Sequence, residues 1–374
     1  MRSLLTILLL SISLCSNAQH RCGTSIYTEQ LSAKYEDYSK ARSKVNKETE
    51  DWIKKNYHDQ IKTIIKIPVV VHVVWNTNTE NISDAQIFSQ IDILNKDYRR
   101  QNIDTINTPN VWKNIAADCE IEFCLANTDP NGNTTTGINR VQTNISSFSM
   151  SGNPVMSSSS GGADPWDQDS YLNIWVCDLG SGLLGYASPP SSWPNPNDGV
   201  VIGYRYFGNT GTAQPPYHKG RTATHEIGHW LNLEHVWGAW GSCGNDQVSD
   251  TPIQETENYS CPSFPSTSIC SGQSNTPNGD MFMNYMDYTN DACMNLFTEG
   301  QKSRMIAAIN QYRPNLLSHS LCQGGVSAIN KDITSSKKIV KIIDVLGRET
   351  QEKKNIPIFY IYENGNVERK IIID

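Results

Sequence analysis

The chain lacks both an excess of positive charge and long hydrophobic segments. Its 374 residues include 31 lysines and arginines against 38 aspartates and glutamates, which gives a net charge of −7. This balance removes the electrostatic basis for nucleic-acid binding and for a polybasic membrane contact. No run of residues approaches the ~18 consecutive apolar residues of a transmembrane helix. We therefore expect a soluble mature protein that neither binds nucleic acid nor inserts stably into a membrane.

The most apolar run of the chain lies near its first residue. Arg2 precedes a hydrophobic stretch that ends at Leu14 and is too short to span a bilayer as a mature helix. Small side chains then stand at the two places that a signal peptidase reads. We predict a signal peptide over residues 1–18 and a secreted protein, extracellular or at the cell surface. Lipid anchoring through Cys15 is disfavoured, because Leu14 is too bulky for that processing.

Histidine is scarce, with eight in the chain, yet three of them stand between positions 225 and 235. On a helix, His225 and His229 lie one turn apart on one face, so both rings can bind the same ion. Glu226 lies beside them but outside the ligand set, so its carboxylate can take a proton from a metal-bound water. His235 supplies a third ligand. The spacing is typical of a catalytic zinc site. The alternative is that these are ordinary core or surface histidines, but with so few histidines in the chain this spacing would rarely arise by chance.

The third ligand requires the helix to end. A straight helix would carry His235 roughly 10 Å along the axis from His229, at about 1.5 Å per residue. A residue with positive φ stops a helix most sharply, and Asn232 stands where a glycine is expected. We predict a left-handed Asn232 between the second and third ligands.

Separated motifs now point to a family. The segment 225–235 resembles the long zinc signature of the metzincins, with Asn232 in place of the usual glycine, and Met286 resembles the methionine of their Met-turn. The segment Val248-Ser-Asp-Thr-Pro252 lies between them. The residues of these motifs and their order are similar to those of the pappalysin family over about residues 66–318. The resemblance implies an α+β fold of the metzincin zincin type. A twisted mixed β-sheet, an active-site helix and a loop-rich C-terminal subdomain would form a catalytic domain over 62–320.

The resemblance also implies roles for residues around the zinc motif. Met286 would form a hydrophobic floor beneath the histidines without binding the metal. Tyr288 would hydrogen-bond the oxyanion of the tetrahedral intermediate, and a buried packing aromatic is the alternative. Asp246, Asp250 and Thr251 would give oxygen ligands to calcium, and an Asp-rich turn without metal explains them nearly as well.

Nine cysteines follow the signal segment, and export permits disulfides. Four of them flank a loop-rich stretch between the zinc motif and the Met-turn, where cross-links contribute most. Four cysteines allow three connectivities, of which the resemblance implies Cys243–Cys270 with Cys261–Cys293. The odd total leaves at least one thiol unpaired.

The resemblance further implies a preference for Arg or Lys immediately after the cleaved bond. The sequence does not identify the acidic pocket residue that would bind this side chain.

Residues 19–61 are polar and charged, with helical patterning over 32–57, and we predict that they form a pro-segment. Arg21-Cys22-Gly23 is its sharpest feature, because a thiolate is an excellent zinc ligand and Cys22 can fill the fourth coordination position. This resembles the cysteine switch that keeps related metalloproteases latent. An unpaired or disulfide-bonded cysteine near a flexible terminus explains Cys22 equally well.

The region before the zinc motif predicts a sheet with a helix packed on it. The run 67–75 is continuous and β-branched, as in a strand buried on both faces, and His72 within it is expected to be a core residue. A capping box at Ser83–Gln86 begins an amphipathic helix. The edge segment 183–187, which resembles the strand above the family's cleft, can pair with an extended peptide. Further strands are predicted at 121–125, 172–177 and 199–204, and a helix capped by Thr298 should end at Pro314.

The composition changes after position 326. Residues 327–374 are lysine-rich and carry three strand-like runs, two of them divided by Asn364-Gly365, a strong hairpin signal. This small β-module resembles the C-terminal sorting domain of the type IX secretion system, which implies the secretion machinery as a partner. A small accessory β-module is the alternative.

The leading hypothesis is therefore a secreted zinc endopeptidase, made as an inactive precursor, that cleaves an extended peptide or protein. A zinc hydrolase of a non-peptide amide or ester would share the metal chemistry. A surface binding module with a structural zinc would need a closed four-ligand site, whereas three histidines leave one position open.

Overall fold

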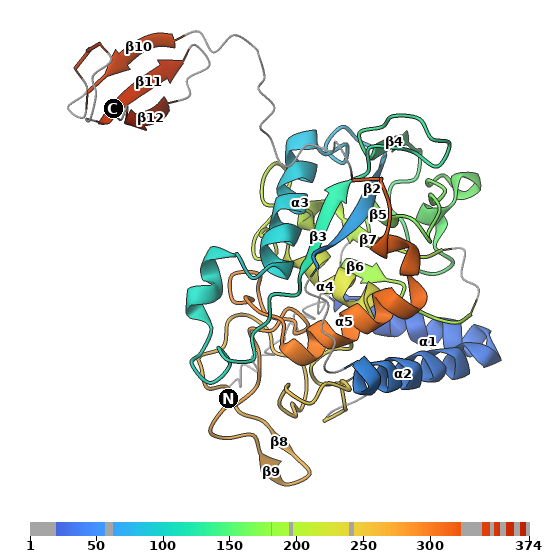
Figure 1. The fold of residues 1–374 in the computed structure, drawn as a ribbon. Coiled ribbons are helices and arrows are strands. Elements are labelled where there is room, and N and C mark those ends of the chain that lie inside the picture. Colours follow the sequence, from blue (N-terminus) through green and yellow to red (C-terminus); the bar gives the residue numbers. More distant parts are fainter. Residues whose placement is uncertain are drawn as a thin grey trace, which may run out of the picture. The chain divides into compact units, whose positions relative to one another are not determined.

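The computed structural model describes residues 20–56, 63–180, 182–193, 197–238, 243–322, 339–344, 348–351, 357–362 and 367–371. The chain divides into two compact units, Met1–Gly325 and Val326–Asp374, which are treated separately (Figure 1). The predicted signal peptide and the Asn364-Gly365 turn lie outside the described residues. No helix among the described residues is long and apolar enough to cross a membrane.

The first unit is built on one mixed sheet in the order β1-β6-β7-β5-β2-β3, with β4 also paired to β2. Every pairing is parallel except that of β6 with β7. Nine of the eleven residues of β2 are buried, as its β-branched composition predicts. The strands are β1 (His20–Cys22), β2 (Ile65–Trp75), β3 (Ile121–Leu125), β4 (Ile138–Gln142), β5 (Leu172–Cys177), β6 (Leu183–Ala187) and β7 (Val200–Gly203).

Two helices cover one face of this sheet. Helix α3 (Asp84–Tyr98) packs on β3, α4 (Arg221–Trp230) packs on β6 and β7, and the two helices contact each other. Ser83 caps α3 by accepting from Gln86 N at 3.2 Å. The Gln86 side chain instead donates to the carbonyls of Tyr204 and Phe207, so only the serine half of the predicted capping box forms.

The N-terminal segment forms two helices, where the sequence predicts one helical stretch. Helix α1 (Thr24–Lys34) and helix α2 (Glu36–Asn56) are separated at Tyr35, and α2 packs along α5 (Glu299–Tyr312). Thr298 caps α5 in a complete capping box with Gln301, and α5 ends before Pro314, as predicted. The segment 20–56 is thus a folded part of the first unit.

The chain between α4 and α5 is mostly irregular, as expected of a loop-rich C-terminal subdomain. Among its described residues, the regular structure is one short hairpin, β8 (Ile269–Cys270) with β9 (Gln273–Ser274). With the mixed sheet and few helices, this confirms the predicted α+β class. Short 3₁₀ turns connect the elements: η1 (Ile103–Asn107), η2 (Pro154–Met156), η3 (Ser158–Ser160), η4 (Tyr204–Tyr206) and η5 (Pro314–Leu317).

The second unit contains a three-stranded antiparallel sheet, β10-β11-β12. Its strands are β10 (Ile339–Ile343), β11 (Pro357–Tyr362) and β12 (Val367–Ile371), where the sequence predicts three strand-like runs. The role of this β-module in sorting stays a prediction.

Candidate active site

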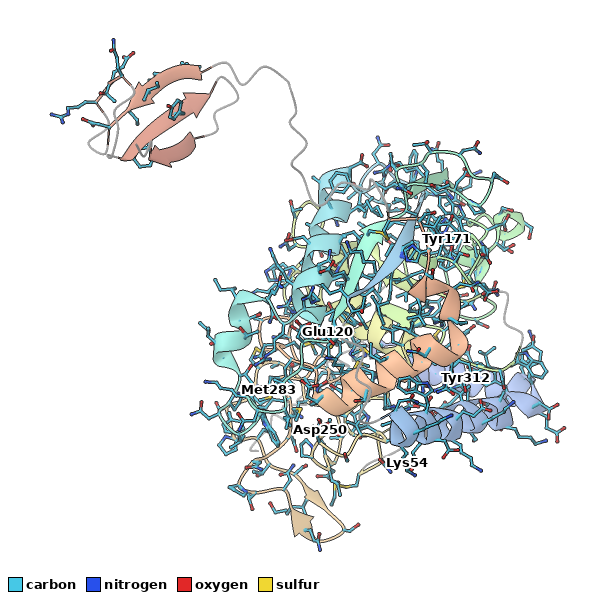
Figure 2. The ribbon with its side chains drawn as sticks, in the orientation of Figure 1. Lys54, Glu120, Tyr171, Asp250, Met283 and Tyr312 are labelled. Carbon is cyan, nitrogen blue, oxygen red and sulfur yellow. A yellow bond between two sulfur atoms is a disulfide. The ribbon has the colours of Figure 1, made fainter. Side chains whose placement is uncertain are left out.

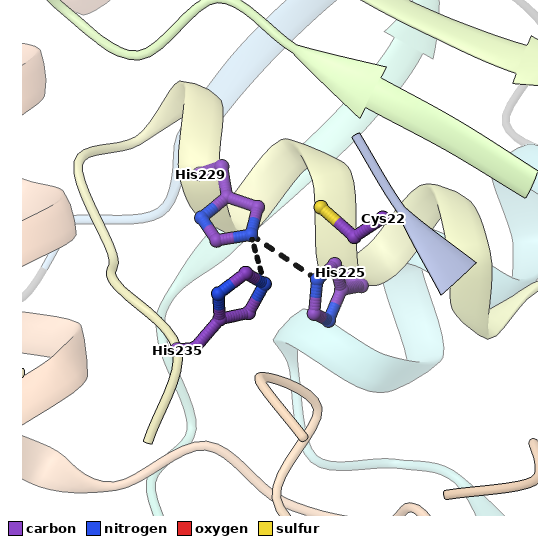
Figure 3. Close-up of side chains that lie close together, drawn as sticks. All are labelled: Cys22, His225, His229 and His235. Atoms are coloured by element: carbon purple, nitrogen blue, oxygen red, sulfur yellow. Dashed lines mark hydrogen bonds between the residues drawn. The ribbon is translucent and has the colours of Figure 1, made fainter. Parts of the chain in front are cut away.

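Three imidazoles converge at the carboxyl end of α4. His225 and His229 lie one helical turn apart, and the Nε2 atom of His229 is 3.1 Å from that of His225 and 3.1 Å from that of His235 (Figure 3). Nitrogens bound to one tetrahedral zinc at about 2.0–2.1 Å lie roughly 3.3 Å apart. The three nitrogens are therefore spaced to bind one ion.

The turn after α4 brings the third histidine back. The helix ends at Trp230, and Asn232 adopts φ 73°, the left-handed conformation that the sequence predicts. The reversal also places the carbonyl of Leu233 2.7 Å from Nδ1 of His229. One residue in a rare conformation thus positions His235 and orients His229.

Hydrogen bonds fix the tautomers that a metal site needs. Nδ1 of His225 donates to the Tyr285 carbonyl at 2.7 Å and Nδ1 of His229 to the Leu233 carbonyl, so both Nε2 lone pairs face the centre. Burial lowers the pKa of His229 to about 4 and holds the pKa of His225 and His235 well below the ordinary value. All three rings are neutral at neutral pH, which is the form that binds zinc.

The motif glutamate follows His225 in α4, and its carboxylate contacts Cys22, which lies beside the three imidazoles. Glu226 is fully buried, and its Oε1 has no hydrogen-bond partner among the described residues. Its Oε2 accepts from the Thr24 hydroxyl at 2.8 Å and from the Cys22 thiol at 3.4 Å. Burial raises the pKa of the Glu226 carboxyl to about 8, although these two hydrogen bonds oppose the shift. A carboxyl with such a pKa can exchange a proton near neutral pH.

Cys22 joins the three histidines from the other end of the chain. Its Sγ and one nitrogen of each imidazole all lie within 4.8 Å of one another, and all four side chains are buried (Figure 3). Burial, followed by the nearby Glu226 carboxylate, raises the thiol pKa well above the ordinary value. The structure therefore places Cys22 at the open corner of the cluster as a free cysteine.

Strand β1 delivers this cysteine. It pairs in parallel with β6, with Cys22 opposite Gly185, and the next residue, Gly23, donates its N–H to the Gly185 carbonyl at 2.9 Å. The hydroxyl of Thr24 accepts from the Ala187 N–H at 2.9 Å. The sequence predicts the strand β6 but not its partner β1. A strand of three residues is too short to show a periodic hydrophobic pattern.

Met286 is the methionine of the Met-turn, and Tyr288 stands two residues after it. The Tyr288 hydroxyl donates to the Cys22 carbonyl at 3.4 Å, and its ring lies 5.0 Å from that of His235 and 5.8 Å from that of His225. Met286 is fully buried below α4, where a Cβ on Gly228 would lie 2.6 Å from its Sδ. Gly228 is required for this close approach of helix and Met-turn.

Comparison with known proteins now decides the family. The model of peptidase family M43, described as pregnancy-associated plasma protein-A, matches residues 156–310. An extracellular metalloprotease of Arthroderma otae is 31% identical over 255 residues, which are 67% of this chain and 79% of that protein. The chain belongs to this family. The M43 chain is thus a metalloendopeptidase that acts on peptide or protein substrates, which decides against the two rival hypotheses.

Two solved structures resemble the M43 chain closely. A promirolysin mutant of Tannerella forsythia is 49% identical, with a TM-score of 0.72 over 80% of this chain and 97% of that one. Mature mirolysin of the same organism, in complex with a cleaved peptide, is 53% identical, with a TM-score of 0.64 over 69% of this chain and 100% of that one. Both likenesses agree with the predicted metzincin-type fold.

An acidic residue near the M43 active site escaped the sequence analysis. Asp291 is fully buried, and its Oδ1 accepts from Nη2 of Arg21 at 3.3 Å. Its Oδ2 accepts from the backbone N–H groups of Lys219 and Arg221 at 2.8 and 3.2 Å. The Arg21 guanidinium also lies 5.1 Å from the centre of the Tyr217 ring. Asp291 and Arg21 are 270 positions apart, so no local pattern signals this pair.

The predicted calcium residues form a hydrogen-bonded turn. Asp246 accepts from the Thr251 hydroxyl at 2.7 Å, and burial raises the pKa of its carboxyl to about 6. Asp250 lies at the start of α5, where it accepts from the Thr298 hydroxyl at 2.7 Å and the Gly300 N–H at 2.8 Å (Figure 2). The Asp250 carboxylate therefore stabilises the N-terminus of α5. Calcium binding at this turn stays a prediction.

Three disulfides cross-link the described residues of the first unit. Cys243 pairs with Cys270 and Cys261 with Cys293, which is the connectivity that the resemblance implies. A third, which the sequence analysis missed, joins β3 to the end of the unit through Cys124–Cys322. Among the described cysteines, the remaining thiols are those of Cys22, Cys119 and Cys177.

Proposed function

We propose that the chain is a secreted zinc-dependent endopeptidase, synthesised as a latent precursor, in which His225, His229 and His235 bind the metal. The observation that carries this proposal is the convergence of three Nε2 atoms of neutral imidazoles beside a buried carboxyl. Neutral imidazole is a preferred zinc ligand, and a site with three protein ligands keeps one position for chemistry. The donor set thus fits a catalytic zinc.

Each residue of the site has one task in peptide hydrolysis. A zinc ion bound here would lower the pKa of a bound water toward about 7 and would polarise the substrate carbonyl. Glu226 accepts the proton of the attacking water and returns it to the departing amine. Tyr288, whose hydroxyl bonds the Cys22 carbonyl in the precursor, donates the same hydrogen bond to the oxyanion of the substrate.

Latency is proposed to come from residues of the pro-segment. Cys22 fills the position where water would bind, while Thr24 occupies one oxygen of the Glu226 carboxylate. Breaking these contacts exposes both groups at once. In support, the matched share of this chain is 80% against promirolysin and 69% against mature mirolysin, as expected if the extra part is a removable segment.

An extended substrate would pair with β6 after the pro-segment leaves. Strand β1 already uses the backbone of β6 in this way, in the parallel sense. A peptide bound antiparallel to β6 would run opposite to β1, so its residues after the cleaved bond would lie on the side now held by Arg21. The reversed direction also keeps the pro-segment from presenting its own peptide bonds as a substrate does.

The Arg21 position supports the predicted preference for Arg or Lys after the cleaved bond. The Asp291 carboxylate would bind the cationic end of that residue, as it binds Arg21. The face of Tyr217 would favour the planar guanidinium of arginine over the ammonium of lysine. We assign Asp291 as the acidic residue of this specificity pocket.

The segments of the chain are assigned as the sequence analysis predicts. Residues 1–18 are proposed as a signal peptide, 19–61 as the pro-segment, 62–320 as the catalytic domain and 327–374 as a type IX sorting domain. Export is supported by the relatives named as extracellular metalloproteases. Calcium is proposed at the Asp246–Thr251 turn.

A digest of a peptide library tests the proposed function. The protein is purified, activated by limited proteolysis, and incubated with the library with and without a zinc chelator. Mass spectrometry should show chelator-sensitive cleavage before Arg or Lys. Absence of cleavage by a folded, zinc-loaded activated protein would refute the proposal.

A further inference from the structure

Asn232 stands where a glycine is expected, and both ends of its side-chain amide form hydrogen bonds. The residue is completely buried, its Oδ1 accepts from Nη1 of Arg42 at 3.0 Å, and its Nδ2 donates to the Thr49 hydroxyl at 3.1 Å. Glycine adopts the required left-handed conformation at lower cost. The turn alone therefore does not explain an asparagine, whereas the two bonds to helix α2 do.

These partners lie on one face of α2. Arg42 and Thr49 are seven positions apart, which is two helical turns, and Val45 between them is also buried. Arg42 additionally donates to Glu234 at 3.3 Å and to the carbonyl of Pro190. One side of the pro-segment helix is thus matched to the end of the active-site helix.

Helix α5 completes the surface. Nη2 of Arg304 bridges the Asn232 carbonyl and Oδ1 of Asn46, both at 3.1 Å. The Tyr312 hydroxyl, at the end of α5 that lies against α2, donates to Glu48 at 2.6 Å (Figure 2). Lys54, at the C-terminal end of α2, is exposed and pairs with Glu50 one turn earlier in the same helix. The contacts are confined to the face of α2 that meets the turn and α5.

We infer that Asn232 is a second attachment point of the pro-segment, independent of Cys22, and that this is why the motif carries asparagine. This inference rests on the proposed latent precursor. Cys22 blocks the metal from the substrate side, whereas α2 holds the turn between the second and third ligands from behind. Breaking the thiol contact alone would leave the segment attached, so release requires both contacts to open. Once α2 has left, the buried amide has lost both partners.

Hydrogen exchange of the intact precursor tests this without relying on activity. A Glu226→Ala background prevents self-cleavage, so the segment stays covalently attached in every variant. Thr49→Val keeps the shape of the side chain and removes the acceptor, and Arg42→Met removes the donor. Ser43→Ala, on the exposed side of α2, and Lys44→Met, an exposed charge on the same helix, are the matched controls.

The expected result is that Thr49→Val speeds exchange of α2 amides about three- to tenfold and Arg42→Met by more, while both controls leave it unchanged. In an Asn232→Gly background, Thr49→Val should add nothing, because the amide it bonds is gone. Cys22→Ala should speed exchange in β1 but not in α2. Equal effects of Thr49→Val in both backgrounds, or α2 exchange that follows Cys22 alone, would overturn the inference. Failure of the activated protein to cleave peptides would count against the proposed function and leave this readout intact.

Discussion

Trp237 lies flat against the imidazole of His235, with 4.4 Å between ring centroids and 3° between ring planes. His225 and His229 each donate Nδ1–H to a backbone carbonyl, whereas Nδ1 of His235 lies 3.4 Å from the Ser25 hydroxyl of α1, its one hydrogen-bond partner among the described residues. Stacking on Trp237 would therefore orient the third proposed ligand once the proposed pro-segment has left.

Trp237→Ala should weaken zinc binding by about tenfold, as does the loss of other groups that orient metal ligands. Trp237→Phe should restore most of the affinity because it keeps an aromatic face. Competition with a chromophoric chelator measures this on the activated protein. Equal zinc affinity of the alanine variant and the parent would contradict the assignment.

Glu226→Ala should retain zinc and lose activity by a factor of about 10²–10⁴, since general-base catalysis contributes that much. The mutation removes no metal ligand, so metal content measured on the same preparation is the internal control. Proteolysis at the parental rate would remove Glu226 from its role.

Cys22→Ala should raise the peptidase activity of the uncleaved precursor at least tenfold, because the fourth metal position opens. Cys119→Ala is the matched control, since Cys119 is an equally buried free thiol outside the metal cluster. The activated forms of all three proteins should be indistinguishable. A silent Cys22→Ala precursor with full zinc content would exclude the thiol as a blocking ligand.

Asp291→Asn should lower kcat/KM about a hundredfold for peptides with arginine after the cleaved bond, because a buried charge pair is lost. The matched comparison is citrulline, which has nearly the shape of arginine without its charge. The parent should prefer arginine strongly and the variant should discriminate weakly. An unchanged arginine-to-citrulline ratio would place the specificity elsewhere.

Acid should destabilise the fold through His72, which is fully buried on β2 and is not a member of the histidine cluster. Its Nε2 lies 2.9 Å from Oδ1 of Asn173 and its Nδ1 lies 3.1 Å from Nδ2 of Asn139, an arrangement that suits the neutral ring. Burial lowers the pKa of His72 to about 4. The unfolded chain binds this proton at higher pH, so stability is complete above about pH 6.5 and falls toward pH 4, by about 3 kcal/mol.

Chemical denaturation between pH 7 and pH 4.5 measures this loss. His72→Gln should reduce the slope of unfolding free energy against pH, whatever its effect at neutral pH. Parent and variant share the three metal-binding histidines, whose acid sensitivity cancels in the difference. Parallel curves for the two proteins would rule His72 out.

The parts of the site that local sequence encodes were predictable, and those that depend on distant pairing were not. The ligand spacing, the left-handed Asn232 and the buried strand β2 follow from periodicity and backbone preference. Strand β4 was missed because, as an edge strand with no buried residue, it shows no apolar alternation. The pairs Arg21–Asp291 and Cys124–Cys322 join residues about 200 or more positions apart, and only the folded chain brings them together.

The Cys124–Cys322 bond has a mechanical consequence. It ties Cys322, the last described residue of the first unit, to strand β3, which lies 198 positions earlier in the chain. Tension applied from beyond Cys322 would reach β3 through a covalent bond instead of peeling α5 from its neighbours. The first unit would therefore keep its shape if the 326–374 unit were pulled upon or clipped off.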